Sequence, residues 1–278
     1  MRDVIRATLG EHPASHFAHA YDVLDPKLKP DGKADPEARD KWLERCEQIL
    51  VSPDYALPYR RWKDSFGTEA ETRVVEAKSR ILIGHGNPSG SDVGLTVHHT
   101  WGVPILPGSA LKGLTANYVD VVYGDREEPE RRGWLGPTWT GRRINRGDGA
   151  GEHFGRLFGA PAVDGEEGSD RRGLVEFHDA LYVPRSAGSQ PFARDVLTVH
   201  QKQYYDSQGK SWPNDWDSPN PVGFVTAKPG TRFLLVLTGA SGWRERAMTL
   251  LLEALSDWGI GGKTSAGYGR LRVSAPSR

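Results

Sequence analysis

The chain has 278 residues, 37% of them apolar, and its 36 basic and 36 acidic side chains give a formal net charge of zero. This length suits one large domain or two small ones with a substantial core. The charge balance excludes binding of nucleic acid by bulk positive charge, although a local basic groove remains open. A single cysteine, Cys46, excludes a disulfide framework and a cysteine zinc site.

The N-terminal part is polar, and we expect residues 1–78 to form a partly helical extension ahead of a second unit at 79–278. Pro36, Trp42 and Cys46 recur at helical spacing and predict a helix over 35–49. Residues 57–66 combine arginines and aromatic rings, which could stack on bases or anchor a packed segment. Because the N-terminus is polar and no apolar run approaches the ~18 residues of a membrane helix, we expect a cytoplasmic protein without a membrane partner.

The second unit alternates short strands with two amphipathic helices. A helix is expected over 110–122, begun by Ser109 as its capping residue. Short strands are expected at 80–84, 96–100, 103–106, 174–183, 195–205 and 270–274, with a hairpin at 222–227 and 232–238 and a second helix over 241–258. This order predicts an α+β fold with a ferredoxin-like, or RRM-like, core and large loop insertions.

A glycine-rich loop follows the second helix. Residues 259–269 read GIGGKTSAGYG, with five glycines in eleven positions around Lys263. We expect uncovered backbone N–H groups here, which would suit a phosphate or a nucleic-acid backbone. An ATP-binding P-loop is not expected, because Asp257 stands where its first glycine belongs and the order is helix, loop, strand. A glycine-rich turn without a ligand remains the other interpretation.

Several motifs together resemble one family. They are TVHHTWGVPILPGSALKG at 96–113, FGRLFG at 154–159, LVEFHDA at 174–180, VHQKQYY at 199–205, NDWDSPNPVGFV at 214–225 and LSDWGIGGKTSAGYG at 255–269. The chain resembles the RAMP superfamily over roughly residues 79–274, and within it the sixth RAMP subunit of the type III-B CRISPR (Cmr) effector complex.

The resemblance implies an RRM-like, non-catalytic RNA-binding subunit that needs no cofactor. Such a subunit caps the backbone filament near the 3′ end of the guide CRISPR RNA, and it contributes to target RNA binding and antiviral defence. The expected partners are CRISPR RNA, target RNA, the backbone RAMP, the small helical subunit and another terminal RAMP. Target cleavage would belong to the backbone subunit.

The chemistry of two segments agrees with RNA backbone contact. Lys112 is expected in the first turn of a helix, whose free N–H groups and dipole favour phosphate. In the glycine loop, Lys263, Thr264 and Ser265 supply donors and Tyr268 supplies a ring. His98 and His99 are expected as neighbours of this RNA site.

Two other functions remain open. In a metal-independent endoribonuclease that processes guide precursor, His98 or His99 would act as acid or base. The two point to opposite faces of an extended segment, so only one could enter a site. A purely structural cap would not touch RNA. A metal site is not expected, because the histidines lack helical i, i+4 pairing and Asp215 and Asp217 lack a third ligand.

Overall fold

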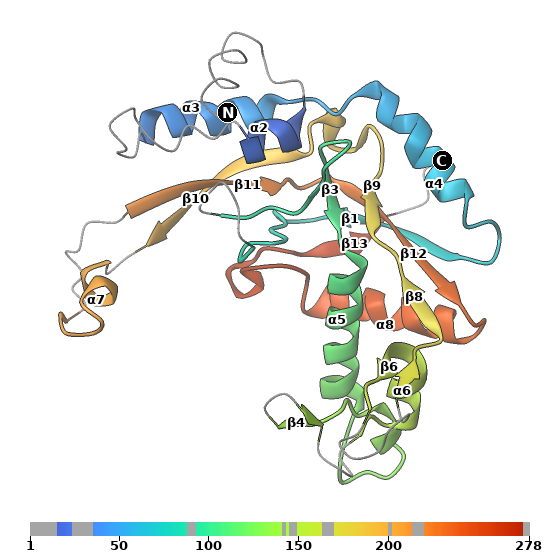
Figure 1. The fold of residues 1–278 in the computed structure, drawn as a ribbon. Coiled ribbons are helices and arrows are strands. Elements are labelled where there is room, and N and C mark those ends of the chain that lie inside the picture. Colours follow the sequence, from blue (N-terminus) through green and yellow to red (C-terminus); the bar gives the residue numbers. More distant parts are fainter. Residues whose placement is uncertain are drawn as a thin grey trace.

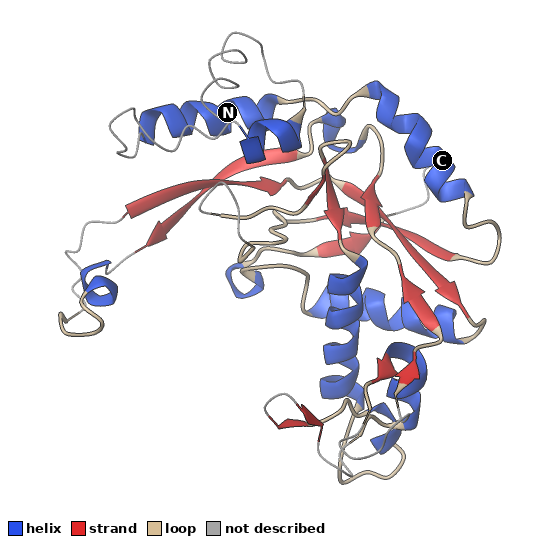
Figure 2. Cartoon of the chain, in the orientation of Figure 1, coloured by secondary structure: helices blue, strands red, loops and turns tan. Residues whose placement is uncertain are grey.

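The structure is a computed structural model that describes residues 16–23, 36–87, 93–140, 143–144, 149–162, 170–199, 202–212 and 220–274. Asp215 and Asp217 lie outside the described residues. The chain combines an antiparallel sheet with helices on its faces, so the expected α+β class is confirmed (Figure 2). Within the described residues, none of the helices is both long and apolar enough to span a bilayer.

Seven strands form the central sheet. Its order is β13-β1-β12-β9-β3-β2, with β8 paired to the far end of β12. The strands are β1 Glu71–Ala77, β2 Val97–His98, β3 Val103–Leu106, β8 Val175–Phe177, β9 Ala180–Tyr182, β12 Arg232–Gly239 and β13 Leu271–Val273. The expected boundary at residue 78 therefore falls after the first strand of this sheet.

The segment expected as a strand over 80–84 makes a single antiparallel bridge, between Ile81 and Ala227. Ile81, Leu82 and Ile83 are all buried, which explains their apolar character without a strand. The hairpin expected from 222–227 and 232–238 is also wrong, because β11 (Asn220–Ala227) pairs with β10 (Phe192–Val199) instead. The chain leaves β11 and enters the central sheet as β12, beside β1.

Two helices, α5 (Gly108–Tyr118) and α8 (Trp243–Asp257), cover one face of the sheet (Figure 1). Alternate residues of β12 point into this layer, with Phe233, Leu235 and Leu237 in the main core. They pack with Leu251 and Leu255 of α8. Burying each such side chain contributes about 1.5–3 kcal/mol, so this layer is the main source of stability.

An insertion follows α5 at the end remote from the sheet. A wide helical turn, Val119–Tyr123, ends the helix, and Tyr118 and Tyr123 donate hydrogen bonds to Asp257 (2.7 Å) and Glu253 (2.6 Å) of α8. The insertion then contains a 3-10 turn Arg132–Trp134, β4 Trp139–Thr140, β5 Arg143–Ile144, α6 Glu152–Phe158, β6 Gly159–Ala160 and β7 Arg171–Arg172.

A long hairpin arm, β10–β11, extends away from the body and carries α7 (Lys202–Asp206) beyond its end (Figure 1). Two N-terminal helices, α2 (Phe17–Val23) and α3 (Pro36–Gln48), lie over the arm. Their side chains form a second core with the arm, made of Phe17, Tyr21, Trp42, Leu43, Cys46, Phe192 and Val225 among others. The helix expected over 35–49 is confirmed as α3.

The basic-aromatic segment forms helix α4 (Ala56–Asp64), which follows a 3-10 turn at Pro53–Tyr55. Its rings pack on one another and toward the body: Trp62 lies 5.2 Å from Phe66, which lies 4.6 Å from His178 between ring centroids. Arg60, Arg61 and Lys63 stay exposed. The aromatic rings of this segment therefore anchor it by packing, whereas its basic side chains do not take part in that packing.

Candidate RNA interface

The glycine loop begins where α8 ends and runs back to β13. Gly259, Gly261, Gly267 and Gly269 all have positive φ. At Gly269 a Cβ atom would lie 2.1 Å from the carbonyl oxygen of Ile260, so only glycine fits this close approach of two backbone segments. The loop is thus closed on itself rather than extended.

Several N–H groups expected to be uncovered in this loop are used inside the protein. Ile260 donates to the Gly269 carbonyl (3.0 Å), Gly262 to the Leu82 carbonyl (2.7 Å) and Gly269 to the Arg80 carbonyl (2.8 Å). The bonds to Leu82 and Arg80 fix the loop against the segment at 80–84, and the bond between Ile260 and Gly269 closes the loop on itself. The expectation of a generally uncovered loop is therefore wrong for these three amides.

Three consecutive amides, and that of Gly261 shortly before them, are left unpaired among the described residues. The N–H groups of Lys263, Thr264 and Ser265 donate no hydrogen bond within the part of the chain that the structure describes. Lys263 adopts the left-handed conformation (φ 60°, ψ 32°) and leads into the 3-10 turn Thr264–Ala266. Successive N–H groups in such a turn form a concave site for an anion. The Lys263 ammonium adds a positive charge beside them.

Tyr268 is held inside the protein rather than presented as a free ring. Its hydroxyl donates to Asp195 Oδ2 of β10 at 2.5 Å, and that carboxylate lies 3.4 Å from Arg80 Nε. The ring packs in a small core with Leu82 and Phe224. Burial, together with the Asp195 hydrogen bond and charge, raises the pKa of Tyr268 to about 12. Tyr268 therefore connects the loop to the base of the arm.

The start of α5 differs from the expectation. Pro107 is its capping residue, and Ser109 lies within the first turn. The acceptor for Gly108 N–H is Asp179 Oδ1, at 2.7 Å. Lys112, half-buried, is the fifth residue of the helix and so begins the second turn instead of lying in the first. A phosphate at this helix end would therefore meet the Asp179 carboxylate as a competitor.

His98 and His99 occupy different environments, because the strand expected over 96–100 ends at His98 and His99 begins a turn. His98 is half-buried and His99 is exposed. Nδ1 of His98 is enclosed and has no hydrogen-bond partner among the described residues. Burial lowers the pKa of His98, and the negative charge of Asp179 partly offsets this. His98 is therefore mainly neutral at pH 7, with Asp179 close by.

Segment 81–87, buried at residues 81–83 and exposed from His85 on, connects the two candidate regions. Leu82 accepts from the glycine loop, and Ile83 accepts from Thr96 N–H (2.8 Å), directly before β2 and His98. His85 is exposed and lies beside the loop, because a Cβ atom on Gly262 would stand 3.4 Å from that of His85. His85 therefore lies beside Gly262, the residue directly before Lys263.

His85 and Asp179 are the site residues that sequence reasoning missed. Their positions depend on close approach between segments distant in the chain, which periodicity does not reveal. For Asp179 the one local signal is its place directly before β9, at a strand end facing the start of α5. No group of three or more metal-ligating side chains occurs among the described residues.

Comparisons with known proteins identify the family of this chain. A family profile described as the RAMP superfamily matches residues 74–272. The curated protein "CRISPR system Cmr subunit Cmr6" of Pyrococcus furiosus is 28% identical over 245 residues, which cover 78% of this chain and 72% of that protein.

Two solved structures are also similar. A chain in the cryo-EM structure of the type III-B Cmr-beta complex bound to cognate target RNA has a TM-score of 0.59 at 19% identity, covering 86% of this chain and 73% of its own. The crystal structure of Cmr6 from Pyrococcus furiosus is 29% identical with a TM-score of 0.41, covering 74% and 98%. The family match spans most of the described fold, from β1 to β13, and this chain belongs to the RAMP superfamily.

Proposed function

We propose that this chain is a non-catalytic RNA-binding subunit of a type III-B CRISPR ribonucleoprotein. It would cap the backbone filament near the 3′ end of the guide CRISPR RNA and contribute to target RNA binding and antiviral defence in the cytoplasm. RAMP membership and similarity to a Cmr6 protein support this proposal. The observation that carries it is the row of three uncovered amides beside Lys263.

The core is proposed to be ferredoxin-like. In chain order, β1, α5, β9, β12, α8 and β13 supply the strand-helix-strand-strand-helix-strand pattern of that fold. The sheet order β13-β1-β12-β9 places the first and third strands of this pattern side by side at its centre. The β2–β3 hairpin, the insertion after α5 and the hairpin arm would be additions to this core.

Backbone donors suit a guide whose sequence varies. Amide N–H groups and a lysine recognise phosphates, which are the same in every nucleotide, whereas sequence is read from base edges. Thr264 and Ser265 add hydroxyl donors on the same turn. The guide and target RNAs would be shared with the proposed partner subunits, namely the backbone RAMP, the small helical subunit and another terminal RAMP.

The test is guide-RNA binding by the complex reconstituted with a Lys263→Ala variant of this chain. We expect the affinity to fall several-fold and the slope of log affinity against log salt to decrease by about 1, because one phosphate contact is lost. Lys41→Ala, an exposed lysine on α3, is the matched control and should change neither quantity. Equal affinity and slope for Lys263→Ala and the control would support a structural cap without RNA contact.

Catalysis is tested separately by incubating the purified chain with CRISPR repeat RNA. The proposal predicts binding without cleavage. Cleavage that disappears in His98→Ala or His99→Ala would replace the proposal with the endoribonuclease alternative. Both variants are informative, since the enclosed His98 and the exposed His99 differ in their access to RNA.

A further inference from the structure

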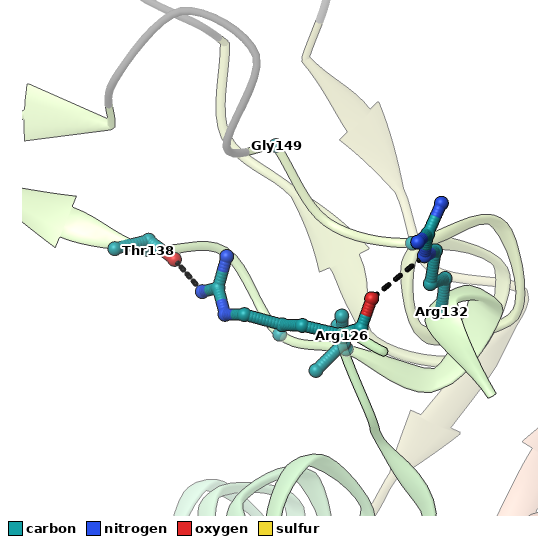
Figure 3. A pocket seen from close by; sticks show the side chains of 7 residues that line it. Arg126, Arg132, Thr138 and Gly149 are labelled. Atoms are coloured by element: carbon teal, nitrogen blue, oxygen red, sulfur yellow. Dashed lines mark hydrogen bonds between the residues drawn. The ribbon is translucent and has the colours of Figure 1, made fainter. Parts of the chain in front are cut away.

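A cavity of about 250 Å³ opens in the insertion that follows α5. It is lined by Arg126, Arg132, Thr138 and Leu135, together with three glycines. None of these lining residues is acidic. Figure 3 shows the Arg126 side chain extending toward Thr138, the Arg132 guanidinium beyond the Arg126 backbone, and the backbone at Gly149 across from both. The cavity is therefore bordered by two cations and little side-chain bulk.

Asp120 lies against the cavity wall, where its carboxylate accepts the N–H of the lining residue Gly136 at 2.7 Å, and the nearby Asp125 is held by backbone groups. The Asp125 carboxylate accepts the N–H groups of Glu127 (2.8 Å) and Glu128 (3.3 Å). Arg131 lies 3.7 Å from the carboxylates of both Asp125 and Glu128. Arg131 also donates to the carbonyls of Tyr123 and Val122, which fixes it to the end of α5. Arg131 thus pairs with two of the acidic side chains near the cavity.

Arg132 keeps most of its donors available. Its Nε donates to the carbonyl of Arg126 at 2.8 Å, which orients the guanidinium, and its terminal nitrogens make no hydrogen bond or ion pair with the described residues. Arg126 is oriented in turn by a hydrogen bond to the Thr138 hydroxyl. Oriented guanidinium groups match the oxygens of a phosphate in paired hydrogen bonds.

We propose that this cavity is a second anion site of the protein, which binds the phosphate of a nucleotide. Its volume is below the roughly 300–1,000 Å³ of clefts that enclose drug-sized ligands, so it suits one phosphate with its sugar. Leu135 and the glycines supply an uncharged wall for that sugar. The phosphate belongs either to an RNA strand or to a free nucleotide. The site does not depend on the glycine loop and goes beyond the proposed function.

The full chain is tested by calorimetric titration with adenosine 5′-monophosphate, adenosine and hexaadenylate at low salt. We expect Arg132→Ala to raise the Kd for the monophosphate about five-fold or more, because charged hydrogen bonds to the phosphate are lost. Arg132→Lys should give a Kd between those of the wild type and Arg132→Ala, because lysine keeps the positive charge but lacks the paired donors of the guanidinium group. Arg45→Ala, an exposed arginine on α3, should leave the Kd unchanged.

The probes distinguish the source of the phosphate. Binding of hexaadenylate alone, lost in Arg132→Ala, assigns the site to an RNA strand, and binding of the monophosphate alone assigns it to a free nucleotide. Adenosine that binds as tightly as the monophosphate, no binding by either phosphate probe, or equal Kd values for wild type and Arg132→Ala would overturn the proposal. Lys263→Ala should leave the monophosphate Kd unchanged. Failure of the proposal for this cavity is therefore distinguishable from failure of the proposal for the glycine loop.

Discussion

At the scale of single residues, Asp179 performs the role that the sequence analysis gave to Ser109. It accepts the Gly108 N–H at 2.7 Å and places a negative charge at the positive end of α5. We predict that Asp179→Ala lowers the free energy of unfolding by about 1 kcal/mol, measured by urea denaturation. Asp179→Asn keeps the acceptor and should cost less, whereas an equal loss in both variants would assign the effect to charge alone.

His98 gives a pH prediction with a definite sign. Burial lowers its pKa in the folded protein, so the unfolded chain binds more protons between the folded value and the ordinary value of about 6.5. Its contribution to stability is therefore complete above pH 6.5 and is lost as the pH falls. We expect His98→Asn to flatten the dependence of unfolding free energy on pH from 7.5 to 5.5.

The same histidine is measured directly by NMR titration. Its ring should titrate below the value found in a peptide of residues 94–102, and Asp179→Ala should lower the pKa of His98 further by removing a nearby negative charge. A folded-state pKa equal to that of the peptide would contradict the burial argument.

The backbone conformation of the candidate site was predictable where the local sequence sets it. The spacing around Lys263 identified a loop whose three successive amides are uncovered, because glycines and a left-handed residue are encoded in the segment itself. The environment of Tyr268 was not predictable, since Asp195 reaches it from a strand 73 residues away. The same holds for His85, which meets the loop only through tertiary packing.

At the scale of elements, the glycine loop makes unequal demands on its glycines. Gly267 has φ 91° with open space where a Cβ would stand, whereas at Gly269 (φ 74°) that atom would lie 2.1 Å from the Ile260 carbonyl. We predict a loss of about 1–2 kcal/mol of stability for Gly267→Ala and a larger loss for Gly269→Ala, which must also move backbone. Thermal unfolding compares the two, and equal losses would contradict the close approach.

The N-terminal helices are expected to be a stable layer on the arm. Phe17 stacks on Phe192 with 3.5 Å between ring centroids, and Trp42 donates to the Ala20 carbonyl at 2.8 Å. We predict that Phe17→Ala costs about 3 kcal/mol and speeds the reaction of the buried Cys46 with a thiol reagent. Ala56→Gly on α4, outside this layer, is the control and should not change the rate of Cys46 labelling.

Elements with a clear period were predictable, and pairings between them were not. The helices found at Pro36–Gln48 and Trp243–Asp257 match those expected within two residues at each end. Strand Glu71–Ala77 was missed, because Glu71, Arg73 and Glu76 make it look like surface. Its buried side chains, Val75 and Ala77, are too few to reveal the period alone.

At the scale of the whole molecule, balanced charge sets how tightly the isolated chain binds RNA. Since 36 basic and 36 acidic side chains cancel, long-range attraction to phosphates is weak. We predict a Kd above about 1 µM for single-stranded RNA and the isolated chain at physiological salt, with tight binding only in the assembled complex, where contacts add. A nanomolar Kd for the chain alone, measured by fluorescence anisotropy, would contradict this.

The α+β class was predictable from the order of helices and strands, because that order limits the ways in which two helices cover one sheet. The layer formed by α2, α3 and the arm was not predictable, because the apolar face of a helix does not reveal which surface it packs against. Only the buried set around Phe17, Trp42 and Phe192 shows that the extension packs on the arm.

The bond between Tyr268 and Asp195 has a mechanical consequence. It joins the turn that carries Lys263 to the base of β10, and Arg80 pairs with the same carboxylate oxygen. A neighbouring subunit that moves the arm must therefore break the hydrogen bond between Tyr268 and Asp195 or move Lys263 together with the arm. Tyr268→Phe removes this hydrogen bond and keeps the aromatic ring. Movement of the arm would then no longer be transmitted to Lys263 at the proposed RNA site.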